Sequence, residues 1–222
     1  MARRTKIEAA ATREALLDAA ERVFREQGVA HTSLAAVAEA AGLTRGAVYW
    51  HFRDKADLFE ALCARVTLPM EAMVASVGGA RHDDPLAALR TLAIDGLTRL
   101  AADARAHAVF DVIFHKCEFT AELATVVERQ KSADRGCRTN IERLLKQAVA
   151  RRQLAPDTDT RLAATTMNSF MVGVMHQWVQ DPAAYDLART ASAMVDLFVA
   201  GLRACPPRRK TAAARRRTPA RA

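Results

Sequence analysis

The chain has 222 residues, of which 50% are apolar and 5% aromatic, and a formal net charge of +8. It has no uncharged apolar run of about 18 residues, which excludes an ordinary membrane-spanning helix. Its basic N-terminus lacks the apolar core of a secretory signal, which favours a cytosolic location. The four cysteines are too scattered for a disulfide framework or a zinc motif, so we interpret them as core or surface thiols and expect no cofactor.

Positive charge is concentrated at the C-terminal end. Residues 205–222 contain seven Arg and Lys side chains and no acidic residue, whereas residues 56–204 are nearly neutral. A basic end can add sequence-independent affinity for phosphates. The segment has few long aliphatic side chains to bury, so we expect 205–222 to be a disordered tail.

Residues 1–11 are expected to form a flexible basic arm. A helix over 12–28 follows, because Leu16, Ala20 and Phe24 recur at helical spacing and Gly28 provides a stop signal. The apolar face of this helix is expected to pack on the segment that comes next.

Residues 32–55 predict two short helices joined by a tight turn. Thr32 or Ser33 can cap the first helix, and Thr44 can cap the second. Gly42 suits the turn because glycine adopts a positive φ at little cost. Together with the preceding helix, this segment predicts a three-helix, helix-turn-helix unit over residues 12–55.

The second short helix is rich in hydrogen-bond donors, among them Thr44, Arg45, Tyr49 and His51. A donor-rich helix held by a rigid partner fits the major groove of double-stranded DNA. The alternative for Tyr49 and Trp50 is packing beneath the following helix. A catalytic role for His51 finds no Ser, Cys or Asp partner at a recognisable spacing, and we expect no enzyme.

A fourth helix is expected from Lys55, capped by Asp54. A lysine in the first turn is unfavourable for the helix dipole, so Lys55 indicates a nearby phosphate. Pro69 removes a helical hydrogen bond, and we expect the helix to kink or restart there.

The rest of the chain to Arg203 shows helical patterns and no strand signals, which predicts an all-α protein of about nine helices. His115 and Cys117 point to different sides of a helix and cannot chelate one metal ion together. A structural role for them, and for His107, is the simpler interpretation. The expected helices cover residues 85–102, 105–117, 120–153, 158–180 and 186–203.

The run from Leu43 to Lys55 resembles the signature of the TetR family of transcriptional repressors. The run from Phe114 to Phe119, the turn from Leu154 to Pro156, and Trp178 with Asp181 and Pro182 resemble the AcrR and TtgR branch, which controls multidrug efflux pumps. The resemblance covers roughly residues 10–204.

This resemblance implies a dimer that binds a roughly palindromic operator, with residues 56–204 forming a ligand-binding and dimerisation domain. Dimerisation is expected through helices 158–180 and 186–203. Arg45 is the best candidate for reading a base edge, because its guanidinium can bond guanine bidentately. The residues expected to contact DNA are Thr32, Ser33, Thr44, Arg45, Gly46, Tyr49, Trp50, His51 and Lys55.

The resemblance also implies a pocket for a small hydrophobic, drug-like inducer. Methionines would suit it, because their side chains are flexible and polarisable, whereas plain core packing is the alternative for each residue. Gln147 and His176 are further polar candidates. The expected lining residues are Cys63, Val66, Leu89, Leu92, Phe110, Phe114, Cys137, Ile141, Asn168, Met171 and Met175.

Two other interpretations stay open at this level. A weakly specific architectural DNA-binding protein could rely on the arginine tail, and a regulator of the same fold could control a metabolic operon instead of a pump.

Overall fold

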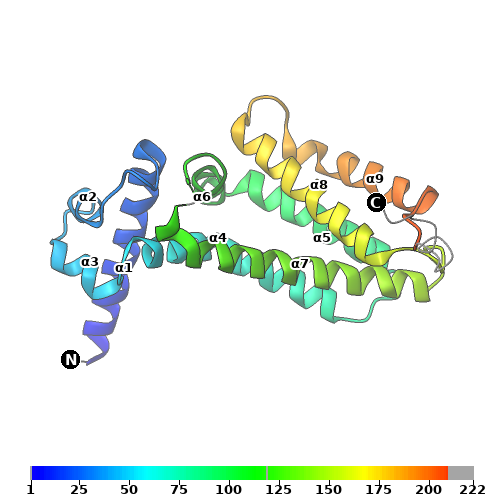
Figure 1. Ribbon diagram of the computed structural model, residues 1–222, viewed down its shortest axis with the longest axis horizontal. Helices are drawn as coiled ribbons and strands as arrows, with labels where there is room; N and C mark the ends of the chain where they lie inside the picture. Colours follow the sequence, from blue (N-terminus) through cyan, green and yellow to red (C-terminus); the bar gives the residue numbers. More distant parts are fainter. Residues whose placement is uncertain (1, 119, 210–222) are drawn as a thin grey trace, which may run out of the picture.

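The computed structural model describes residues 2–118 and 120–209, with side chains from Lys6 onward. These residues form nine α-helices and one 3₁₀ turn, η1, and no strand beyond an isolated bridge (Figure 1). The all-α prediction is confirmed. The elements are α1 (Ala2–Gln27), α2 (Leu34–Ala40), α3 (Arg45–His51), α4 (Lys55–Gly79), α5 (Pro85–Ala102), α6 (Ala104–His115), η1 (Ala121–Leu123), α7 (Ala124–Ala150), α8 (Thr160–Gln180) and α9 (Leu187–Ala204).

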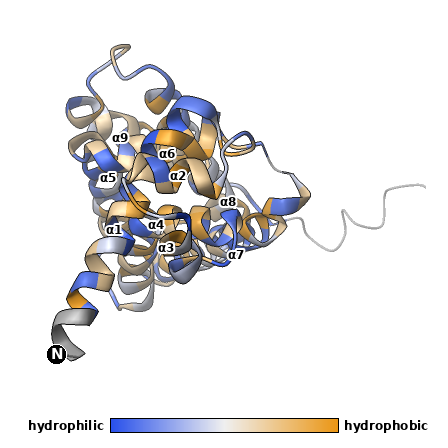
Figure 2. Ribbon diagram, turned by 90° about the vertical axis from the view of Figure 1, so that its left-hand side faces the viewer, coloured by the Kyte–Doolittle hydropathy of each residue, from blue (hydrophilic) through white to orange (hydrophobic). Residues whose placement is uncertain are grey.

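The N-terminal unit consists of α1, α2 and α3, packed around Leu16, Phe24 and Val48, which are all fully buried. Gly42 has a φ of +66°, as the turn between α2 and α3 requires. The expected arm over residues 1–11 is corrected: from Ala2 onward these residues extend α1. The N-terminal end of α1 projects from the body of the molecule (Figure 2).

Side-chain oxygens cap most of the helices, because the first N–H groups of a helix have no partner within it. Ser33 caps α2 and Thr44 caps α3. Five further helices begin after an aspartate whose carboxylate accepts from a backbone N–H: Asp54, Asp84, Asp103, Asp159 and Asp186.

Helix α4 connects the two parts of the molecule. Its first turns bury Leu58, Phe59 and Leu62. The rings of Phe59 and of Phe24 on α1 form a T-shaped pair with their centroids 5.8 Å apart. The predicted restart at Pro69 is wrong, since α4 continues through this residue to Gly79.

The C-terminal domain is a bundle in which α4 and α8 pack on α7, and α5 packs on α9 (Figure 1). Helix α6 lies where the bundle meets the N-terminal unit, in contact with α1, α4 and α8. No helix within residues 2–118 and 120–209 is both long and apolar enough to cross a membrane.

The predicted helices of this domain need small corrections. Residues 121–123 form η1, α7 ends at Ala150, and α8 starts at Thr160 rather than at residue 158.

The first residues of the expected tail are ordered: Arg208 pairs with Asp157, and the Arg209 N–H donates to the Asp157 carbonyl at 2.9 Å. Residues 210–222 lie outside the described part of the chain.

Helices α4 and α7 approach each other closely at Gly78. A Cβ atom at this position would lie 2.6 Å from Cβ of Asn140 and 2.9 Å from its Cα, whereas a Cβ at Gly79 would meet nothing within 4 Å. We therefore expect Gly78→Ala to lower the free energy of unfolding by about 1–3 kcal/mol. Gly79→Ala is the matched control and should leave it unchanged or slightly raised. Urea unfolding measures both variants, and equal effects would contradict the close-packing argument.

Candidate DNA-binding surface and ligand cavity

Helix α3 presents its polar side chains to solvent. Thr44, Arg45, Gly46 and Tyr49 are all exposed, and the Thr44 hydroxyl oxygen accepts from the Ala47 N–H at 3.3 Å. The guanidinium of Arg45 lies over the Tyr49 ring, 5.6 Å from its centroid. This contact restrains a long side chain that is otherwise free to reach outward.

Trp50 and His51 continue this surface at the end of α3. Trp50 is 72% exposed, so the alternative of packing beneath α4 is wrong for this residue. Its ring meets His51 edge-on at 4.5 Å. Burial, and then the positive charge of Arg13, lower the pKa of His51, which favours a neutral imidazole at pH 7.

The structure does not present Thr32 and Lys55 to solvent, in contrast with Ser33, which is exposed. The Thr32 hydroxyl donates to the Gly28 carbonyl at 2.8 Å. The Lys55 ammonium donates to the Ala30 carbonyl at 3.0 Å and pairs with Glu122 at 3.0 Å. Both groups thus have partners within the protein, and a phosphate contact by either residue stays a prediction that would require these bonds to be exchanged.

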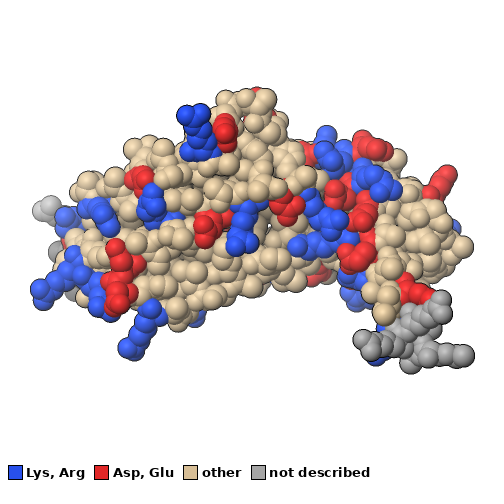
Figure 3. Space-filling view, turned by 180° about the vertical axis from the view of Figure 1, so that it is seen from behind, with Lys and Arg blue, Asp and Glu red and all other residues tan. Residues whose placement is uncertain are grey.

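An ion-pair cluster joins α4 to α1. Arg65 of α4 bonds Asp18 at 2.7 Å and pairs with Glu14, and its side chain is only 11% exposed. Arg105 of α6 reaches the same Asp18 carboxylate at 3.4 Å. Basic and acidic side chains gather where the two domains meet on the face shown in Figure 3. Movement of α4 would therefore be transmitted to α1.

A second junction runs through α6. The backbone N–H of Val29 donates to the Lys116 carbonyl at 2.9 Å, and Arg25 lies 3.8 Å from Asp111. His115 shares Asp111, at 3.1 Å from its Nδ1 atom. The N-terminal unit is thus bonded to α4 and to the C-terminal end of α6, two of the helices that border the interior of the bundle.

That interior contains a cavity of about 610 Å³, which is lined by residues of α4, α5, α6, α7 and α8. Its volume is in the range of small-molecule sites. Of the predicted residues, Val66 is buried but does not line the cavity. The lining includes Cys63, Leu89, Leu92, Phe110, Phe114, Cys137, Ile141, Asn168, Met171 and Met175.

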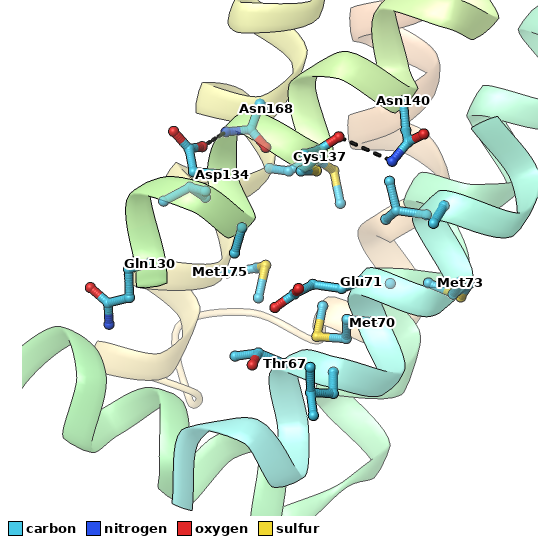
Figure 4. A pocket seen from close by; sticks show the side chains of 18 of the residues that line it. Thr67, Met70, Glu71, Met73, Gln130, Asp134, Cys137, Asn140, Asn168 and Met175 are labelled. Carbon is cyan, nitrogen blue, oxygen red and sulfur yellow. Dashed lines mark hydrogen bonds between the residues drawn. The ribbon is translucent and has the colours of Figure 1, made fainter. Parts of the chain in front are cut away.

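Most of the polar side chains that line the cavity were not predicted from the sequence. Glu71 of α4 accepts from Arg129 of α7 at 2.9 Å through both carboxylate oxygens. Asn168 of α8 donates to Asp134 of α7 at 2.6 Å (Figure 4). These pairs join residues far apart in sequence, so no local pattern marks them. Other lining residues that were not predicted include Glu60, Thr67, Met70, Met73, Gln130, Asn140 and Met167.

The two other polar candidates do not line the cavity. Gln147 accepts from the His82 N–H and donates to the Ala80 carbonyl, which holds the connection between α4 and α5. The ring of His176 packs against Phe114 and His115 at 5.3 and 4.8 Å. Gln147 thus makes hydrogen bonds and His176 makes ring contacts within the protein, outside the lining of the cavity.

The thiols of this region are not activated. Burial raises the pKa of Cys137 and of Cys117 to about 11, and it raises the pKa of Cys63 further. A neutral thiol is a poor nucleophile and metal ligand. In the part of the chain that is described, no three His, Cys, Asp or Glu side chains are arranged to hold a metal ion.

Comparisons with known proteins agree with this geometry. Residues 16–62 match the family model of the TetR family of bacterial regulatory proteins, and residues 84–203 match the C-terminal region of MAATS-type transcriptional repressors. Among curated proteins, the chain is 37% identical to the HTH-type transcriptional regulator AcrR of Shigella flexneri, over 96% of this chain and 99% of that protein.

Two solved structures extend the likeness to the fold. NalD, the secondary repressor of the MexAB-OprM multidrug efflux pump in Pseudomonas aeruginosa, has a TM-score of 0.79 and 34% identity, covering 87% of this chain and 96% of NalD. A complex of SmeT with triclosan has a TM-score of 0.76 and 33% identity, covering 86% and 91%. SmeT represses the SmeDEF multidrug efflux pump of Stenotrophomonas maltophilia. The chain thus belongs to the TetR family, among relatives that regulate multidrug efflux.

Proposed function

We propose that the protein is a ligand-responsive repressor that binds a palindromic operator as a homodimer and leaves it when a small drug-like molecule enters the cavity. The observation that carries this proposal is the double role of α4, which packs in the DNA-binding unit and also forms a wall of the cavity. NalD and SmeT both repress multidrug efflux pumps, which favours a multidrug efflux operon as the target of this protein.

On DNA, α3 would enter the major groove. Arg45 would read a base edge, and Thr44, Tyr49, Trp50 and His51 would bond phosphates or neighbouring base edges, with Ser33 at the start of α2. Gly46 leaves room for the backbone to approach the duplex. One seven-residue helix covers few base pairs, so a two-fold dimer with its recognition helices about 34 Å apart is the geometry that gives specificity.

Apolar side chains on α8 and α9 support the dimer. Leu162 of α8 is 51% exposed and Leu197 of α9 is 77% exposed, while Phe170 and Phe198 stack between the two helices at 5.2 Å. Exposed leucines on two adjacent helices are consistent with a partner surface. A second copy of the chain would cover them.

Induction would be a shift between two populations. A ligand can shift the equilibrium only by its difference in affinity for the two states. A displacement of α4 by ligand would reach α1 through Arg65 and its partners Glu14 and Asp18. The distance between the two α3 helices of the dimer would then no longer match the spacing of the two operator half-sites.

A regulator of a metabolic operon remains the alternative, and the ordered residues 205–209 give no support to DNA binding through the tail.

Selection from a random duplex library tests the proposal directly. We expect an inverted repeat to be enriched and apolar drug-like compounds, triclosan among them, to release it. Enrichment of no sequence, or enrichment that depends on residues 210–222, would favour the architectural alternative.

Removal of the Arg45 side chain should impair base recognition. We expect Arg45→Ala to weaken operator binding by about 1–3 kcal/mol and to relax preference at one base pair in each half-site. Fluorescence anisotropy on the selected operator and on a scrambled duplex measures both effects. Arg143→Ala, which removes the same charge from an exposed site on α7, is the control. An equal loss on both duplexes would mean that Arg45 contacts only phosphate.

A charge on the exposed face of α9 should separate the protomers. We expect Leu197→Asp to shift the protein from dimer to monomer in sedimentation velocity, because the partner surface cannot solvate a carboxylate. Ile7→Asp introduces the same charge at another exposed aliphatic residue, on α1, and should leave the dimer intact. A dimeric Leu197→Asp protein would exclude this face as the interface.

Filling the cavity should uncouple the ligand from DNA. Met175 is buried and lines the cavity, so Met175→Trp should lower ligand affinity at least tenfold and change operator affinity less than twofold. Titration of operator-bound protein with an active compound measures both quantities. Met175→Leu preserves the volume and should behave as the unmodified protein does. If the compound releases the Met175→Trp protein from the operator normally, the inducer binds outside this cavity.

A further inference from the structure

Three segments of the C-terminal domain meet at the end of the molecule opposite α3, on the right in Figure 1. They are the connection between α4 and α5 (80–86), the end of α7 to the start of α8 (147–161), and residues 203–209. The Gln147 amide donates to the Ala80 carbonyl at 2.8 Å, and the Asp159 N–H donates to the Pro207 carbonyl at 2.6 Å. We call this bonded end, formed by the three segments, the distal pole.

The net charge of the chain is concentrated at the distal pole. Its three segments contain seven arginines and four aspartates, and residues 210–222 add five basic side chains and no acidic one. Together these residues carry the whole formal net charge of +8, so the rest of the chain, which includes α3, is neutral overall. Basic side chains gather at the left-hand end of the view in Figure 3, where the pole is seen from behind.

Every aspartate of the pole is bonded within the protein. Two of them pair with Arg151 and Arg208, and the other two accept from backbone N–H groups at the starts of α5 and α8. Arg209 is held as well, because its Nε atom donates to the Thr158 carbonyl at 3.2 Å. Within the described part of the chain, these bonds leave the other arginines of the pole without an ion pair.

Arg81, Arg152 and Arg161 are exposed, and their side chains make no hydrogen bond or ion pair with any described residue. Arg152 also has a φ of +59°, a left-handed conformation that glycine adopts far more readily than other residues at a helix end. An arginine at this position accepts backbone strain and places an unpaired charge beyond the last turn of α7.

These charges are remote from the recognition helix. Helix α4 starts next to α3 and ends at the pole, and its 25 residues rise about 37 Å along the helix axis. Exposed charges are screened over about 8–10 Å at physiological salt. The arginines of the pole therefore act on something other than the duplex that α3 would contact.

The chemistry of the pole fits the phosphate backbone of a duplex. Arginine bonds phosphate oxygens through a planar fork of donors. No Phe, Tyr or Trp occurs in the three segments or in residues 210–222, so no such ring is available to stack on unpaired bases. The exposed Leu162 beside the pole belongs to the surface proposed for the dimer, which leaves no apolar anchor for a bilayer or a protein partner.

We propose that the distal pole binds the phosphate backbone of a second DNA duplex, so that a repressor on its operator bridges two segments of DNA. This inference goes beyond the proposed function. Helix α3 selects the operator, whereas the pole holds neighbouring DNA of any sequence, with a strength that depends on salt.

A two-duplex assay on the full chain tests this inference. The selected operator is immobilised and saturated with protein, and a fluorescent duplex of unrelated sequence is added at increasing salt. We expect one complex that holds both duplexes, with a slope of log K against log salt of about −0.9 for each phosphate neutralised. Displacement of the operator by the second duplex, with no complex that holds both, would overturn the inference.

Two sets of substitutions remove charge from this end of the chain: Arg81→Gln, Arg152→Gln and Arg161→Gln in the pole, and Arg215→Gln, Arg216→Gln and Arg217→Gln in the tail. Each set should weaken capture of the second duplex about tenfold and flatten its salt dependence. Affinity for the isolated operator should change less than twofold. Unchanged capture with either set, or an equal loss of operator binding, would contradict the proposal.

The matched control removes three exposed arginines elsewhere: Arg99→Gln, Arg135→Gln and Arg189→Gln, on α5, α7 and α9. It lowers the net charge equally and should leave capture unchanged, and an equal loss would mean that net charge alone matters. Vesicles of anionic phospholipid and single-stranded RNA replace the second duplex in parallel runs. Tighter capture of either one would overturn the assignment to duplex DNA.

The outcome is separable from that of the proposed function. If no operator is selected, the unrelated duplex is titrated into the DNA-free protein. Weaker binding by the substituted pole, and not by the control, would then support DNA binding at the pole although the repressor function had failed. Equal binding by all variants would overturn both.

Discussion

Arg65 forms ion pairs with Asp18 and Glu14 and thereby bonds the helix that lines the cavity to the helix that supports the DNA-binding unit. Arg65 lies on α4 between residues that line the cavity, and its two partners lie on α1, the helix that supports α2 and α3. The Arg65 side chain is mostly buried while the Asp18 and Glu14 side chains are half-exposed, so these two carboxylates are what balances the charge of the guanidinium. These contacts tie the N-terminal unit to α4, and in the proposed mechanism a ligand that displaces α4 would displace this unit with it.

The cavity itself is maintained by polar contacts across helices. Glu71 and Arg129 connect α4 to α7, and Asp134 and Asn168 connect α7 to α8, so the helices are bonded around the space as well as packed at its ends. Near the far end of α4, Gly78 allows direct contact with Asn140. A bundle held in this way keeps an apolar interior accessible to a ligand instead of collapsing to fill it.

Local chemistry explains why much of this could be predicted from the sequence. The caps at Ser33 and Thr44, the turn at Gly42 and the inward faces of α4 to α8 depend on near neighbours in the chain. Lys55 could not be placed, because its partners, the Ala30 carbonyl and Glu122, come from distant segments. Val66 lies one helical turn after Cys63 and was predicted to line the cavity with it, but its side chain is buried elsewhere in the core. Glu60 and Glu71 carry no periodic signal, since a charged residue on α4 is equally typical of a solvated surface.

The aspartate caps give the fold a built-in sensitivity to acid. A carboxylate is the better acceptor when ionised, and α4, α5, α6, α8 and α9 each begin after a capping aspartate. At Asp84 the bond from the Ala87 N–H, followed by that from Gln153, lowers the pKa below its unfolded value. The stabilisation from this cap is present above the unfolded pKa and is lost as the pH falls through the lower, folded one. Strong acid would thus loosen α5 at its start, where Gln153 links that turn to the segment after α7.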